Sequence, residues 1–117
     1  MVEIDRMALV LRPRQPFIDW LKAIADDEHV TDQTLQTDPT VVLVPVIDNE
    51  EELGVYVAQN YRPWLEHEFG SWCLKEEDWP KDRDLQAFQK YFDLDIHSLV
   101  IDSIAEEYTD YENVTLQ

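Results

Sequence analysis

The sequence predicts a small mixed fold of the α/β or α+β class, with helices packed on a three-stranded sheet. Three observations indicate it: an apolar, mostly Val run in mid-chain, a shorter apolar run near each end, and apolar residues at helical spacing between these runs. With 117 residues, 44% of them hydrophobic, the chain is expected to fold as one domain, residues 1–117.

The mid-chain run covers residues 40–47 and predicts the main strand. Val and Ile fit a pleated strand because their side chains are stiff at χ1. Alternate side chains are apolar on both sides of this strand, so we expect both of its faces to be covered. Pro45 has no N–H and should lie near the strand end, at a bulge or on a sheet edge.

Residues 7–11 predict the first strand, ended by Arg12 and Pro13. A helix should follow from Pro16, since proline is well suited to a first turn. Its apolar side recurs at helical spacing: Phe17, Trp20, Leu21 and Ile24. Residues 29–39 are polar and predict a long connection.

A helix cap is predicted at Asp48, with Glu51 three residues later. Apolar residues then keep a helical spacing as far as Trp72, although Pro63 interrupts the segment. Because proline removes a hydrogen bond and restricts the residue before it, we expect two helices, about 49–60 and 63–69. Gly70 should stop the second one.

A further short helix is predicted from Leu85, Phe88, Tyr91 and Phe92, followed by a third strand over residues 95–102. The expected order is therefore β-α-β-α-α-α-β, and crossovers of this length favour parallel strands. A small antiparallel or mixed sheet is the alternative. The acidic residues 103–117 are expected to form a last helix or a partly ordered tail.

The net charge is −17, from 26 acidic and 9 basic residues, and it is unevenly distributed. Residues 1–25 hold three acidic and four basic side chains, a balance of +1, so the remaining residues carry −18. Such a surface disfavours direct binding to nucleic-acid phosphates and suits a protein with a basic surface. Solubility alone is the other reading of the charge.

Residue patterns for common chemistry are missing from the sequence. The two glycines, Gly54 and Gly70, exclude a glycine-rich phosphate loop, and no hydrolase, zinc-protease or calcium-loop motif occurs. His67 lies between two glutamates on a predicted helix, where neighbouring side chains diverge, so a solvated helix face is favoured over a metal site. Cys73 precedes several acids and is interpreted as a packed structural thiol. We expect no metal, no cofactor and a non-enzymatic role.

An aromatic and acidic stretch between residues 61 and 80 holds three of the four tryptophans. Exposed aromatic side chains beside acids are typical of protein-docking surfaces, and packing in the core is the alternative. The predicted partner-binding residues are Tyr61, Glu66, Glu68, Trp72, Glu76, Glu77, Asp78 and Trp79. Of these, Trp79 is the tryptophan least expected to be buried.

An alternative site depends on parallel strands, whose carboxyl ends meet at one sheet edge. That edge would bring together four charged side chains able to bind a small anion or other small molecule, to form the site of an enzyme, or to pair with one another: Arg12, Arg14, Asp48 and Asp102.

The order of elements and the acidity resemble those of barstar-like ribonuclease inhibitors, a likeness of architecture and charge that transfers no residue role. From the acidic surface and the aromatic side chains we hypothesise a non-enzymatic domain that binds a basic protein, of the inhibitor, immunity-protein or nucleic-acid-mimic type. The single Cys73, the absence of a signal-peptide pattern and the absence of a long apolar run predict a cytoplasmic protein without membrane association.

Overall fold

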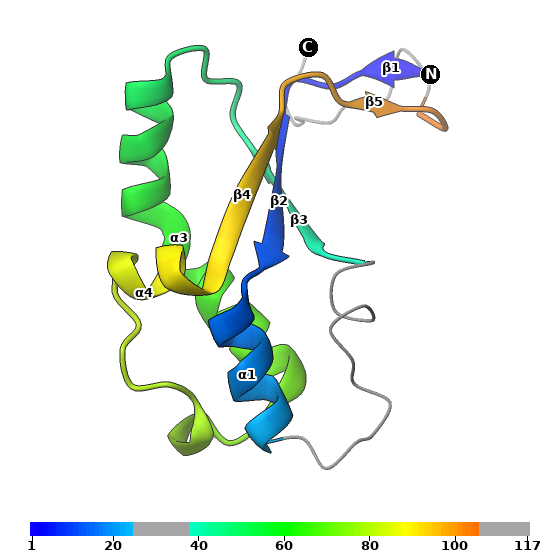
Figure 1. Ribbon diagram of the computed structural model, residues 1–117. Coiled ribbons are helices and arrows are strands. Elements are labelled where there is room, and N and C mark those ends of the chain that lie inside the picture. Colours follow the sequence, from blue (N-terminus) through cyan, green and yellow to red (C-terminus); the bar gives the residue numbers. More distant parts are fainter. Residues whose placement is uncertain (25–37, 106–117) are drawn as a thin grey trace.

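The computed structural model describes residues 1–24 and 38–105 and has the mixed helix-and-sheet architecture of the α+β class. Its main sheet has three strands in the order β3-β2-β4: β2 (Met7–Pro13), β3 (Thr40–Val44) and β4 (Phe92–His97) (Figure 1). Three α-helices are described, α1 (Gln15–Ile24), α3 (Glu50–Trp72) and α4 (Leu85–Tyr91).

Both outer strands run antiparallel to the central strand β2, so the prediction of parallel pairing is wrong. Leu11 near the end of β2 pairs with Thr40 at the start of β3, which shows that the connection leaves and re-enters the sheet at one end. Helix α1 lies beyond that end rather than along the strands (Figure 1). The Val-rich run is consequently an edge strand, and the shorter run near the N-terminus forms the centre.

The register divides the sheet into a covered face and an open face. Leu9 lies opposite Val42 and Ile96 on the side of the helices, whereas Val10 lies opposite Val41 on the other side. Val41 is 53% exposed, so the expectation that both faces of the mid-chain strand are covered is wrong. The reason is that α1, α3 and α4 contribute to one core, on a single side of the sheet.

Helix α3 is continuous through Pro63, so the predicted division into two helices is wrong, as is the stop at Gly70. Buried Tyr61 and Leu65 lie on either side of the proline and anchor the helix to the core, which offsets the lost hydrogen bond. The cap lies one residue after the predicted one: the Asn49 side chain accepts from the backbone N–H groups of Glu51 and Glu52 at 2.8 and 3.1 Å.

Helix α3 is longer than the strands that it covers. Its 23 residues extend about 34 Å, whereas the seven residues of β2 extend about 23 Å. The C-terminal part of α3 therefore reaches past the sheet and meets α1, where the Phe69 ring lies 6.0 Å from Phe17 and 5.0 Å from Trp20. This second contact region holds the aromatic end of the core.

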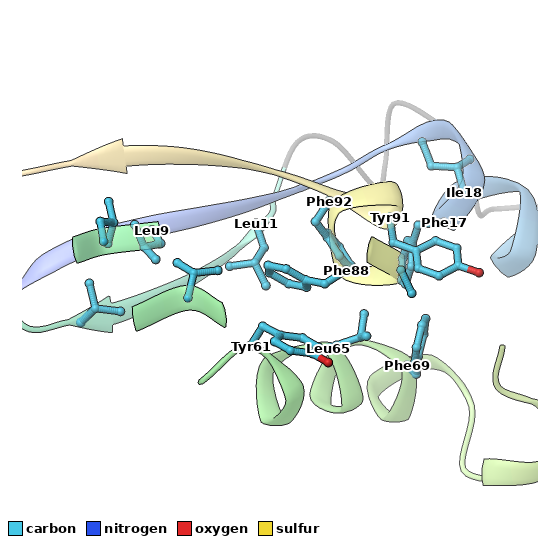
Figure 2. Packing of buried hydrophobic residues seen from close by; sticks show 14 of the residues in the cluster. Leu9, Leu11, Phe17, Ile18, Tyr61, Leu65, Phe69, Phe88, Tyr91 and Phe92 are labelled. Carbon is cyan, nitrogen blue, oxygen red and sulfur yellow. The ribbon is translucent and has the colours of Figure 1, made fainter. Parts of the chain in front are cut away.

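The core lies between the sheet and the helices (Figure 2). Its most completely buried large side chains come from β2, β3 and all three α-helices: Leu9, Leu11, Phe17, Ile18, Leu21, Val44, Leu65, Phe69 and Phe88. The helices predicted from Pro16 and from Leu85 are thus confirmed, with their apolar sides buried.

A second, two-stranded sheet joins β1 (Val2–Glu3) to β5 (Ile101–Asp102). It prolongs the β2–β4 ladder, because the Ile4 N–H donates to the Val100 carbonyl at 3.0 Å. Val2 pairs with Asp102 and Ala8 with His97, so six steps on one strand match five on the other. The N-terminal segment between the two ladders is thus one residue longer than the segment opposite it.

The strand predicted at 95–102 therefore starts earlier, at Phe92, and is interrupted between His97 and Ile101. The predicted connection 29–39 lies mostly outside the described residues, and the predicted C-terminal segment 103–117 lies outside them from residue 106 onward.

Candidate protein-docking surface

A short loop follows α3 and leads into the 3₁₀ turn η1 (Glu76–Asp78). The helix ends where the Cys73 N–H donates to the Phe69 carbonyl at 3.0 Å. The turn closes through the Asp78 and Trp79 N–H groups, which donate to the carbonyls of Lys75 and Glu76, both at 3.0 Å. The loop thus has a defined backbone although it carries few apolar residues.

Two indole groups fix this loop to the rest of the molecule. Trp20 on α1 donates its Nε1–H to the Asp78 carbonyl at 3.1 Å, and Trp79 donates its Nε1–H to the Cys73 carbonyl at 2.8 Å. The Trp79 ring packs on the core, with its centroid 5.9 Å from that of Phe69. The Arg83 guanidinium lies 5.5 Å from the Trp79 ring centroid. The loop is held at both ends.

The fixed loop displays apolar side chains to solvent. Leu74 is 97% exposed and Trp72, on the last turn of α3, is 46% exposed. Glu76, Glu77 and Asp78 on η1 are exposed beside them. We call these five residues the 72–78 surface.

The structure separates the eight predicted partner-binding residues into two groups. Four of them belong to the 72–78 surface, where Glu76 also accepts a 3.3 Å hydrogen bond from Arg83, and the other four contact other parts of the molecule. Tyr61 is buried and donates its hydroxyl to the Arg83 carbonyl at 3.2 Å. Trp79 packs on the core, contrary to the expectation that it is the tryptophan least suited to burial, and Glu66 lies 3.9 Å from Arg62 on the same helix.

Glu68 is the one charged residue among the buried residues that the structure describes, at 7% exposure. The Thr40 hydroxyl donates to its Oε2 at 2.7 Å and joins α3 to the edge strand β3. His67 Nδ1 lies 3.5 Å from the same oxygen. The sequence analysis named Glu68 only as a partner-binding residue, although it lies at helical spacing from the apolar residues Leu65 and Trp72.

Leu74 was missed by the sequence analysis. It belongs to no periodic apolar run, and an isolated leucine between Cys73 and Lys75 has no feature that distinguishes an exposed anchor from a core residue. The exposure of Leu74 can be recognised only when the geometry of the loop is known.

The alternative site of four charged residues is not assembled in this fold. Arg12 forms an ion pair with Asp95, and Arg14 Nε lies 3.9 Å from an Asp93 oxygen, at the end of β2 near Phe92. Asp48 follows β3, whose Val44 pairs with Met7 at the opposite end of β2, and Asp102 pairs with Val2. The antiparallel strand directions remove the convergence that parallel strands would have produced.

Searching residues 1–24 and 38–105 finds no group of three His, Cys, Asp or Glu side chains arranged to hold a metal ion. Over the same residues, no helix has the length and apolar character needed to cross a membrane. Cys73 is half-buried, and its thiol donates to the Lys75 carbonyl at a 3.4 Å sulfur–oxygen distance.

Comparison with known proteins finds no matching family model, no matching curated protein and no matching solved structure. The resemblance to barstar-like inhibitors gains no support from these comparisons, and the geometry alone must suggest a function.

Proposed function

We propose that this protein is a non-enzymatic binding domain whose 72–78 surface docks on a protein with a basic surface. The observation that carries the proposal is Leu74, a fully exposed apolar side chain on a loop that two tryptophan N–H groups hold in place. Inhibitors, immunity proteins and nucleic-acid mimics are examples of this class. The single cysteine of this protein, the half-buried Cys73, suits a reducing compartment, and we propose that the protein is cytoplasmic.

Fixing a loop before binding supports tight association. An apolar side chain on a mobile loop loses conformational entropy when a partner orders it, whereas one on a fixed loop has lost most of that entropy already. Trp72 lies two residues before Leu74 and offers a large aromatic surface, and tryptophan is enriched among residues that dominate binding energy.

The acidic side chains supply direction rather than most of the affinity. Glu76, Glu77 and Asp78 border the apolar pair, and the whole chain carries −17, so a basic partner is attracted before contact. Lys75 within the loop reduces the local charge by one unit. Association should therefore slow as salt screens the charges.

The test is partner capture followed by measured affinity. Immobilised protein is exposed to lysate at low salt, the retained proteins are identified by mass spectrometry, and the strongest one is purified for calorimetry. Leu74→Ser should weaken the binding of that protein by about 1–2 kcal/mol, which is roughly five- to thirtyfold.

The matched control is Val55→Ser on α3, which removes a 52% exposed apolar side chain outside the 72–78 surface. Val55→Ser should bind the purified partner with an affinity within about twofold of that of the natural sequence. Equal losses in the two variants, or a set of retained proteins with no basic bias, would contradict the proposal.

A further inference from the structure

A hollow of about 190 Å³ adjoins the 72–78 surface between α3, α1 and the start of β3. Trp72 and Ser71 lie on one side of it, Pro39 and Thr40 on the other, and Phe17 and Glu68 also line it. The exposed Asp38 is a further lining residue. We call it the Trp72 hollow; its volume equals that of about six water molecules at ~30 Å³ each.

The Trp72 hollow is negative and contains no compensating charge. Two carboxylates line it, from Asp38 and Glu68, and none of its described lining residues is Lys, Arg or His. Its remaining walls are largely apolar or aromatic, with Leu11 and Phe17 among them. A cation entering this hollow would be attracted by both carboxylates, of which the one from Glu68 is buried.

Glu68 supplies a second, independent observation. Its side chain is 10% exposed, and both of its close contacts, from Thr40 and His67, are to Oε2. Among residues 1–24 and 38–105, no donor forms a hydrogen bond with Oε1. A carboxylate has about four acceptor sites on its two oxygens, so Glu68 can accept further hydrogen bonds from a donor that enters the hollow.

We propose that the Trp72 hollow receives an arginine side chain of the basic partner, with the guanidinium against Glu68 and Asp38 and its plane along the Trp72 indole. This inference rests on the proposed function and names the group that the partner inserts. A guanidinium forms paired hydrogen bonds with carboxylates and stacks on aromatic rings, whereas a lysine ammonium is a compact, strongly hydrated charge. The geometry of two carboxylates beside an indole therefore favours arginine.

The experiment uses the whole chain and a short blocked peptide with one arginine, compared with the same peptide carrying lysine. Binding is followed by the NMR shift of the Trp72 indole N–H, identified by its loss in Trp72→Phe. The arginine peptide should bind several times more tightly than the lysine peptide. Glu68→Gln, which can still accept from Thr40, should weaken the arginine peptide by about tenfold or more.

Glu66→Gln is the matched control, because Glu66 lies on the same helix, carries the same charge and does not line the Trp72 hollow. It should change the affinity by less than about twofold. Equal affinity of Glu68→Gln and Glu66→Gln, or a peptide that leaves the Trp72 indole unshifted, would overturn the inference.

The two proposals fail in different ways. If the captured protein needs Leu74 but Glu68→Gln binds it normally, the arginine inference is wrong and the proposed function stands. If the arginine peptide binds the Trp72 hollow through Glu68 but no basic protein is captured, the proposed function fails while the chemistry of the hollow is upheld.

Discussion

Tyr91 is an ionisable residue at the aromatic end of the core. It is buried on α4, and its ring makes edge contacts with Phe69 at 5.6 Å and Phe17 at 6.5 Å. Burial raises the pKa of the Tyr91 phenol above 10.0, and the negative charge of Asp82 raises it further. The folded protein therefore holds this proton more firmly than the unfolded chain does.

Alkaline pH should destabilise the protein through Tyr91. The raised pKa contributes stability that is fully present below about pH 10 and is lost as pH rises through the higher folded value. Tyr91→Phe should lose less stability than the natural sequence between about pH 9 and pH 11, as measured by urea denaturation.

A further lesson at the residue scale concerns the tryptophans. Their apolar character did not separate buried rings from exposed ones. Trp79 and Trp20 each donate an N–H to a carbonyl in the loop 73–78, and Trp64 packs on the core beside Tyr56 and Phe88. Such pairings join segments far apart in sequence, so periodicity could not reveal them.

At the scale of elements, the start of α3 depends on one side chain. Asn49 accepts from two backbone N–H groups that would otherwise have no partner in the helix, and Glu50, Glu51 and Glu52 follow in the first turn. The sequence predicted the capping pattern but placed it at Asp48, since Asn and Asp are nearly equivalent as caps. Because both residue types can cap a helix, the sequence locates the start of α3 only to within one residue.

Asn49→Ala should lower the free energy of unfolding by about 1 kcal/mol, because it leaves two N–H groups without their acceptor. The measurement is equilibrium urea unfolding. Asn60→Ala is a control on the same helix, where the lost contact is a single 2.8 Å bond from the side chain to the Tyr56 carbonyl. A smaller loss for Asn49→Ala than for Asn60→Ala would contradict the cap assignment.

Pro63 lies in the interior of α3, where its ring excludes a hydrogen bond to the carbonyl of Gln59. The prediction of a break failed because local propensity was outweighed by the packing of buried residues on both sides of the proline. Pro63→Ala restores the N–H and should raise the free energy of unfolding by about 1–3 kcal/mol.

Thermal and urea unfolding would check the Pro63 prediction, with Gln59→Ala, an exposed position one turn away, as the neutral control. A loss of stability in Pro63→Ala would show that the proline sets a helix shape that the core requires.

At the scale of the whole molecule, the sequence predicted the mixed fold, the α1 and α4 helices and the apolar side of α3, because these follow from local periodicity. It did not predict strand order or direction. Both depend on where a connection re-enters the sheet, and α1 is too short to distinguish a crossover from a return. The four-residue ligand site was an inference from strand direction, so it disappeared when the direction changed.

The net charge of −17 should make stability depend on salt, since like charges repel more in the compact state. Raising sodium chloride from about 10 mM to about 150 mM shortens the screening length from ~30 to ~8 Å. We expect a gain on the order of 1 kcal/mol, or a melting temperature higher by about 4 °C, in calorimetry.

A variant with Asp48→Lys and Glu77→Lys tests the cause of this salt effect. Each change replaces −1 by +1 at an exposed position, so the net charge rises from −17 by four, to −13. Its melting temperature should rise less with salt than that of the natural sequence. An equal or steeper rise would assign the effect to ion binding or to general salting-out instead.

The pairing of β1 with β5 places the first and last described strands side by side, with the ladder between β2 and β4 continuing from them. A pulling force applied between Val2 and Asp102 would load these hydrogen bonds one after another, as in a zipper, rather than all at once in shear. The two-stranded ribbon should therefore open at low force, while the aromatic end of the core, far along the ladder, is loaded last.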